Sequence, residues 1–192
     1  MNKENQRVKL TRQLLQNSLI ELMQEKPIAK TTIKEICENA DINRSTFYLY
    51  YADQYALLNE IEADVMAHMK EHMEKIGADP GTIQYLRDLL TYVKEHTGLF
   101  KTLLNPQGSP SFQNVFVEAT MQYLRGRIIL SSAPNVTEYT YSFLVMGCIS
   151  VIVKWLEAGC DVPCQEMAEL IFHLSNRAAS PYVTVPDTKP AP

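Results

Sequence analysis

The spacing of apolar residues predicts helices along almost the whole chain. Apolar side chains recur at intervals of three and four positions, which is the period of a helix with one buried face. The strict alternation that marks a half-buried strand is scarce. Breaks at Pro27 and at the ADPG segment of residues 78–81 divide the pattern into separate helices. The fold class expected from this pattern is all-α.

Two short helices are expected near the beginning of the chain. Thr32 and Glu35 have the spacing of a capping box, so a helix is predicted to begin after Thr32. Asp41 is expected in a tight turn, and Asn43 can cap the second short helix. A longer helix, capped by Asp53, is expected to follow. Two short helices joined by a tight turn indicate a helix-turn-helix.

The second short helix carries the sequence NRSTFYLYY, residues 43–51, with a phenylalanine and three tyrosines. Since residues four apart share one face of a helix, Phe47 and Tyr51 are expected in the core. The remaining side chains would point outward, and their chemistry suits the base edges and phosphates of DNA. These are Arg44, Ser45, Thr46, Tyr48, Leu49 and Tyr50. The alternative is that all of the rings pack a small three-helix core.

The segment from Phe143 to Trp155 is apolar on nearly all sides. In a soluble protein such a helix has neighbours all round it, and Gly147 would let one of them approach closely. The helix is either the centre of a monomer's core, or it packs on its own domain with one face and on a partner subunit with another. The pattern alone leaves both interpretations open. The last long helix, which begins at Pro163, also has an apolar face.

The 192-residue chain has a net charge of −4, and its charge is unevenly distributed. Residues 1–51 carry eight Lys and Arg against six Asp and Glu, whereas residues 52–192 are acidic. Only the N-terminal part could therefore face an anionic polymer such as DNA. No window approaches the ~18 uninterrupted apolar residues of a membrane span, and the start of the chain lacks a secretory signal. We therefore expect a cytoplasmic protein that does not bind a membrane.

A rival motif lies on the predicted helix that follows the helix-turn-helix. His68 and His72 enclose the H-x-x-E-H spacing of an inverted zinc-peptidase motif, and Asp64 lies four residues earlier on the same face. These three residues would then be metal ligands, with Glu71 as the general base of a zinc hydrolase. A charged surface helix explains the same residues without a metal. Because no other catalytic or nucleotide-binding motif is present, we predict no enzyme activity and no cofactor.

The run TTIKEICENADINRSTFYLYYADQYALLNEI, residues 31–61, resembles the DNA-binding domain of the TetR family of bacterial transcriptional regulators. The resemblance covers about residues 7–60, and later segments resemble less closely the C-terminal domain of a TetR subgroup common in Firmicutes. It implies a homodimer on a palindromic operator of double-stranded DNA. It also implies that helices of about residues 136–158 and 163–177 form a four-helix bundle with their mates. The positions that fall on the family pattern are Thr32, Ile33, Ile36, Ala40, Ile42, Ser45, Thr46, Phe47, Tyr48, Tyr51, Leu57 and Leu58.

The resemblance also implies roles for individual residues. Asn43 begins the second short helix, which would read the DNA bases. The other DNA-binding positions divide into base-reading and phosphate-contacting ones. Where the family often has glycine, this chain has Asp41, which tolerates the left-handed backbone of the turn. Where the family usually has lysine, this chain has Gln54, so one phosphate contact lacks its charge. The base-reading positions are Lys34, Arg44, Ser45 and Tyr48, and the phosphate-contacting positions are Thr32, Thr46, Tyr50 and Gln54.

The resulting expectation is a sequence-specific DNA-binding repressor with a helix-turn-helix domain at residues 1–52. Residues 53–179 would form a helical domain for dimerisation and for a small-molecule or protein effector, and residues 180–192 a disordered tail. The alternative is a helical interaction protein without DNA binding. Aromatic and apolar residues that could line an effector pocket, or simply form core, are Tyr85, Tyr92, Phe100, Tyr123, Tyr139, Phe143, Met146 and Trp155.

Overall fold

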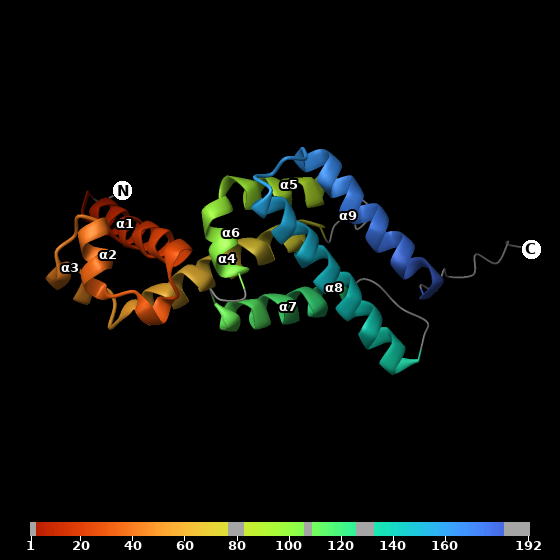
Figure 1. Ribbon diagram of the computed structural model, residues 1–192, viewed down its shortest axis with the longest axis horizontal. Coiled ribbons are helices and arrows are strands. Elements are labelled where there is room, and N and C mark those ends of the chain that lie inside the picture. Colours follow the sequence, from red (N-terminus) through yellow and green to blue (C-terminus); the bar gives the residue numbers. More distant parts are fainter. Residues whose placement is uncertain (1–2, 77–82, 106–108, 126–132, 183–192) are drawn as a thin grey trace, which may run out of the picture. The chain divides into compact units, whose positions relative to one another are not determined.

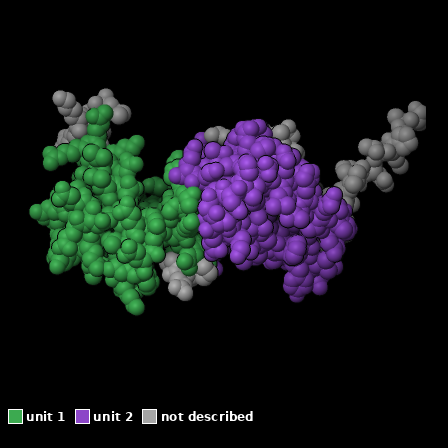
Figure 2. All heavy atoms as spheres, turned by 45° about the horizontal axis from the view of Figure 1, so that its top comes forward, with its two compact units in different colours: residues 1–70, 96–113 green, residues 71–95, 114–192 purple. Residues whose placement is uncertain are grey.

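The computed structural model describes residues 3–76, 83–105, 109–125 and 133–182 (Figure 1). Within these ranges every regular element is a helix, which confirms the all-α expectation. The chain divides into two compact units (Figure 2). Unit 1 comprises residues 1–70 and 96–113, and unit 2 comprises residues 71–95 and 114–192. The last ten residues of the predicted disordered tail lie outside the described ranges.

Unit 1 is built around the N-terminal helices. Its core contains fully buried side chains from four helices, among them Leu19, Ile36, Phe47 and Leu57. The buried Ser18 hydroxyl donates a hydrogen bond of 2.8 Å to the Ile36 carbonyl, which ties the first two helices together. The helix α6 comes from far along the chain and packs against α1. The elements are α1 (Lys3–Glu25), η1 (Ile28–Lys30), α2 (Ile33–Asn39), α3 (Arg44–Tyr48), most of α4 (Gln54–Ile76), α6 (Thr97–Leu103) and the first turn of α7 (Pro110–Arg125).

Local hydrogen bonds set the ends of the short helices as the sequence predicted. The Thr32 hydroxyl accepts a hydrogen bond from the Glu35 amide, and the Glu35 carboxylate accepts one from the Thr32 amide, which completes the capping box. Asp41 has a φ of 53°, the left-handed conformation that the turn requires. The Asn43 side chain caps α3. The Asp53 carboxylate accepts a hydrogen bond of 2.8 Å from the Ala56 amide at the start of α4.

Unit 2 packs α9 against both α5 and α8. Its core cluster includes Leu90 of α5, Trp155 of α8 and Ile171 of α9. The Trp155 indole donates a hydrogen bond of 2.9 Å to the carbonyl of Val162 in the connection between α8 and α9. Gly159, with a φ of 77°, ends α8 at the position the sequence indicated. The elements are α5 (Ile83–Glu95), the remainder of α7, α8 (Pro134–Glu157), α9 (Cys164–Ala179) and η2 (Ser180–Tyr182).

Among the residues that the structure describes, those of α8 are buried on one side of the helix and exposed on the other. Tyr139 is 74% exposed and Phe143 is 68% exposed, whereas Leu144 and Val145 on the other side are buried. The interpretation of α8 as the centre of a monomer's core is therefore wrong. By length and composition alone α8 would suffice to cross a membrane, since an 18-residue window has a mean hydropathy of 1.5. Uninterrupted apolar runs do not reveal this property, because polar residues interrupt the apolar sequence of α8.

Candidate DNA-binding surface

The aromatic residues of α3 and of the segment after it divide into buried and exposed ones. The Phe47 ring is fully buried and the Tyr51 ring nearly so, with their centroids 5.6 Å apart. Tyr48 is 59% exposed, although the edge of its ring still contacts Phe47. Leu49, which follows the helix, is 77% exposed. The alternative in which all of these rings pack the core is therefore wrong for Tyr48.

The outward face of α3 combines a free cation with hydrogen-bonding groups. Arg44 is exposed, and no hydrogen bond or ion pair found within the described ranges uses its guanidinium group. Both the amide and the hydroxyl of Ser45 lie 3.0 Å from Asn43 Oδ1. Because the Ser45 hydroxyl donates its proton to Asn43, its oxygen remains available to accept a hydrogen bond from a ligand.

Thr32 and Lys34, the two predicted DNA-binding residues near the start of α2, both contact other side chains of the protein. The Thr32 hydroxyl donates to Glu35 Oε2 at 2.8 Å in addition to capping the helix. Lys26 lies 2.5 Å from the other Glu35 oxygen, and this hydrogen bond, with those from Thr32, lowers the pKa of Glu35 to about 2. Lys34 is exposed and forms only a 3.8 Å ion pair with Glu38, which water screens.

The remaining predicted residues lie close together in sequence, and all belong to unit 1. Thr46 on α3 and Tyr50 just after it are half-buried. Gln54 is the first residue of α4 and is also half-buried. All nine predicted DNA-binding residues belong to unit 1, and seven of them fall in the segment from Asn43 to Gln54. Leu49 is exposed as the sequence predicts, although it is not among the nine residues predicted to bind DNA.

A hydrogen-bonded network behind α3 was not predicted. The Tyr51 hydroxyl accepts a hydrogen bond of 3.3 Å from Arg12 Nε and donates one of 3.0 Å to Glu60 Oε1. Arg12 also forms an ion pair with Glu60, and Gln16 donates a hydrogen bond of 3.1 Å to Glu60. Burial raises the pKa of the Tyr51 phenol, so it stays protonated and can donate. Arg12 and Glu60 are 48 residues apart, and no sequence pattern relates them.

The eight candidates for an effector pocket have different surroundings in the structure. Phe100 is buried in unit 1, and Trp155 is buried in the core of unit 2. Tyr139, Phe143 and Met146 are exposed on α8. The remaining three are half-buried in unit 2, namely Tyr85 and Tyr92 on α5 and Tyr123 on α7.

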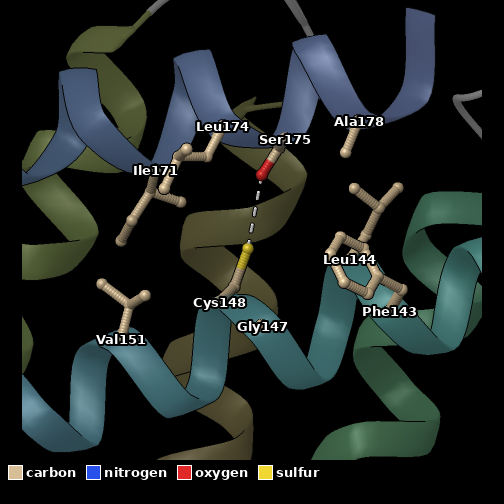
Figure 3. A pocket seen from close by; sticks show the side chains of 9 residues that line it. All are labelled: Phe143, Leu144, Gly147, Cys148, Val151, Ile171, Leu174, Ser175 and Ala178. Carbon is tan, nitrogen blue, oxygen red and sulfur yellow. Dashed lines mark hydrogen bonds between the residues drawn. The ribbon is translucent and has the colours of Figure 1, made fainter.

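A hollow of about 230 Å³ lies between α8 and α9 (Figure 3). Its walls are almost entirely apolar, and Phe143 is the only effector candidate among them. The polar exception is a contact of 3.5 Å between the Cys148 sulfur and the Ser175 hydroxyl. Burial raises the pKa of the Cys148 thiol, which keeps it neutral. The lining residues are Phe143, Leu144, Gly147, Cys148, Val151, Ile171, Leu174, Ser175 and Ala178.

The residues of the possible zinc motif have other surroundings. Asp64 accepts a hydrogen bond of 3.5 Å from Gln16. The ring of His72 stacks on Tyr92 with their centroids 5.4 Å apart, and His68 is exposed on α4. Among the residues placed by the structure, no three His, Cys, Asp or Glu side chains form a group that could hold a metal ion.

Comparison with known proteins extends the resemblance over both parts of the chain. Residues 18–61 match the family described as bacterial regulatory proteins, tetR family, and residues 82–177 match a transcriptional regulator C-terminal region. An uncharacterized HTH-type transcriptional regulator of Bacillus subtilis (strain 168), YxbF, is 21% identical over 168 residues. That match covers 83% of this chain but 43% of the relative, so the chain spans less than half the length of this curated relative.

Solved structures agree in fold. A TetR transcriptional regulator from Streptococcus agalactiae 2603V has a TM-score of 0.64 at 22% identity, covering 90% of this chain and 97% of that one. The regulator FadR from Bacillus subtilis, in complex with stearoyl-CoA, has a TM-score of 0.62 at 13% identity, covering 85% and 96%. The helix-turn-helix geometry of unit 1 and the two sequence matches lead to the same conclusion. The chain belongs to the TetR family of bacterial transcriptional regulators, a family of DNA-binding proteins and not of enzymes.

Proposed function

We propose that this protein is a sequence-specific repressor in the cytoplasm that binds a palindromic operator as a homodimer. The observation that carries the proposal is the outward face of α3, where Arg44, Ser45, Tyr48 and Leu49 are exposed together. A cation, an acceptor, a phenol and an apolar group are the chemical types that read base edges in the major groove. The helix itself is held from behind by Phe47.

Individual contacts follow from these surroundings. Arg44 would pair with a guanine edge, and Ser45 would accept a hydrogen bond from an adenine or cytosine amino group. Leu49 would contact a thymine methyl group. Lys34 and Tyr48 would reach further base edges, and Thr46, Tyr50 and Gln54 would contact phosphates. Thr32 would act chiefly as the helix cap, because its hydroxyl and amide protons both go to Glu35.

The exposed face formed by α8 and α9 supports the homodimer. Tyr139, Phe143 and Met146 on α8 and Leu174 on α9 are exposed, and the apolar hollow lies between the two helices. A contiguous apolar surface of this kind is typical of an interface between subunits. A Cβ atom added at Gly147 would meet nothing within 4 Å, so this part of α8 is open to a closely packed partner. A second copy of the same face would cover it with twofold symmetry.

Control by an effector would act through α4, which belongs to both units. We assign DNA binding to residues 1–52 and effector binding and dimerisation to residues 53–179. A small rotation of α4 would then change the separation of the two reading helices, and half-sites one DNA turn apart demand a fixed separation. The effector is a small molecule or a protein. Stearoyl-CoA, bound by the FadR protein of Bacillus subtilis, is a first probe of it.

The direct test is a selection of duplexes from a random-sequence pool by the purified protein. Fluorescence anisotropy would then compare the selected duplex with a scrambled one at two salt concentrations. We expect a palindromic sequence, nanomolar binding and a preference of at least a thousandfold over the scrambled duplex. Sedimentation should show a dimer, and a reporter gene behind the selected sequence should be switched off by the protein. No detectable binding to any duplex would instead favour the helical interaction protein without DNA binding.

A further inference from the structure

The helix α3 is too short to hold its own position. It has five residues, and a helix of that length is unstable unless its surroundings fix it. Phe47 anchors it by packing alone. The next anchor is Tyr51, three residues after Tyr48, whose ring is 4% exposed and whose hydroxyl is held by polar partners. The orientation of the exposed reading residues therefore depends on Tyr51.

The partners of Tyr51 come from two different helices. Arg12 is on α1 and Glu60 is on α4, and the two also pair with each other. The Arg12 guanidinium carbon lies 5.8 Å from the centre of the Tyr51 ring, which restrains the ring as well as its hydroxyl. The three groups close a ring of interactions in which each member contacts the other two. A closed ring fixes orientation better than a single hydrogen bond, since no member can rotate without breaking two contacts.

We propose that Arg12, Tyr51 and Glu60 are positioning residues that set the angle of α3 for reading DNA, and that Glu60 connects this angle to α4. The proposal rests on the proposed function as a DNA-binding regulator. A reading element must hold its side chains within about 0.5 Å of the productive geometry. A shift of α4 moves Glu60, and through the Tyr51 hydroxyl it turns α3. The network thus makes the affinity for the operator depend on the position of α4.

The test is the substitution Tyr51→Phe, which removes the hydroxyl and keeps the buried ring. Affinity for the duplex selected by the wild-type protein should fall about tenfold, the effect of losing a hydrogen bond to charged groups. Affinity for a scrambled duplex and the slope of log affinity against log salt should stay the same, because no phosphate contact is removed. All proteins are compared at a temperature at which circular dichroism shows them fully folded. A purely structural hydroxyl would leave operator affinity unchanged under that condition.

A second variant and a matched control complete the experiment. Glu60→Gln keeps a hydrogen-bond acceptor but removes the negative charge. The double variant with Tyr51→Phe and Glu60→Gln should lose operator affinity by a smaller factor than the product of the factors lost by the two single variants. Asn39→Ala breaks a 2.9 Å hydrogen bond from α2 to Glu21 of α1 that does not involve α3, and should bind the operator like the wild type. Wild-type operator affinity in Tyr51→Phe would overturn this inference but not the proposed function. So would a loss of affinity in the double variant equal to the product of the two single losses. Failure of the wild-type protein to select any sequence would overturn the proposed function as well.

Discussion

The exposed faces of α3 and α8 both carry large side chains, but their chemistry differs. On α3 the exposed groups include the Arg44 guanidinium and the phenol of Tyr48. On α8 the exposed face is formed by Tyr139, Phe143 and Met146, and the adjoining hollow is apolar. A surface rich in donors suits a hydrated polyanion, whereas an apolar surface suits another protein surface. Both exposed faces are proposed interfaces, and their chemistry distinguishes the partners proposed for them.

The two helices also differ in what supports them. The 24 residues of α8 form many turns of intrahelical hydrogen bonds, and its buried side packs against α9. The five residues of α3 depend on anchors from behind. Changes on the face of α8 should therefore act on assembly directly. Changes around α3 should alter recognition while the dimer persists.

The largest effect is expected from a charge placed in the apolar face of α8. Phe143→Glu should weaken dimerisation by about a hundredfold or more, because twofold symmetry would bury two carboxylates at one interface. The fold of the monomer should persist, since Phe143 is 68% exposed. Analytical ultracentrifugation would measure the change. Val115→Glu, at an exposed apolar position on α7, is the control and should remain dimeric. An unchanged dimer in Phe143→Glu would remove α8 from the interface.

A smaller effect confined to recognition is expected from Arg44→Ala. Losing a paired contact to guanine should lower operator affinity by about ten- to a hundredfold, with the dimer intact. Replacing the contacted guanine by 7-deazaguanine should weaken operator binding by the wild-type protein and have little effect on binding by the variant. The modified base lacks the N7 acceptor, which is a group that Arg44 would contact. Arg87→Ala, which removes an arginine from unit 2, should bind like the wild type. Equal sensitivity of both proteins to the modified base would exclude Arg44 as its reader.

The sequence predicted the helix-turn-helix well because its determinants are local. The capping box joins residues three apart, and the caps and turn at Asp41 and Asn43 involve only near neighbours. Hydrophobic spacing also placed Phe47 and Tyr51 inside. These features need no knowledge of the rest of the fold. The positions of the reading residues on the outward face followed from the same spacing.

Long-range contacts could not be predicted in the same way. Hydrophobic spacing shows that a helix face is apolar, but it does not show which chain covers that face. The aromatic residues grouped as one effector pocket include Phe100 in unit 1 and the exposed Phe143 in unit 2. The network of Arg12 with Glu60 joins two polar positions whose spacing carries no signal. Each of these features depends on how helices distant in sequence pack together.

A substitution at the N-terminal cap of α2 would test how far the helix-turn-helix depends on local hydrogen bonds. Thr32→Ala should lower the free energy of unfolding by about 1 kcal/mol at neutral pH, since it removes a helix cap. Thermal denaturation would measure the change. Thr91→Ala, which removes a threonine from the interior of α5 that caps nothing, should be neutral or slightly stabilising. A neutral Thr32→Ala would mean that the capping box contributes nothing to the fold.

The same cap should show a defined dependence on pH. Bonding to Lys26 and Thr32 lowers the pKa of Glu35 from 4.5 to about 2 in the folded protein. Its contribution is therefore fully present above pH 4.5 and is lost as the pH falls towards 2. The difference in stability between the wild type and Thr32→Ala should narrow over that interval. A constant difference would show that the Glu35 charge takes no part in the cap.

The smallest effect is expected at the edge of the reading surface, from Gln54→Lys. A new positive charge at the first residue of α4 should raise operator affinity a few-fold and steepen the dependence of log affinity on log salt by about one unit. Part of the gain is offset because a cation at a helix N-terminus opposes the helix dipole. Gln122→Lys adds the same charge at an exposed position of α7 in unit 2 and controls for net charge. If both variants steepen the salt dependence equally, Gln54 does not face a phosphate; if only Gln54→Lys does, the DNA-contacting surface extends from α3 to the start of α4.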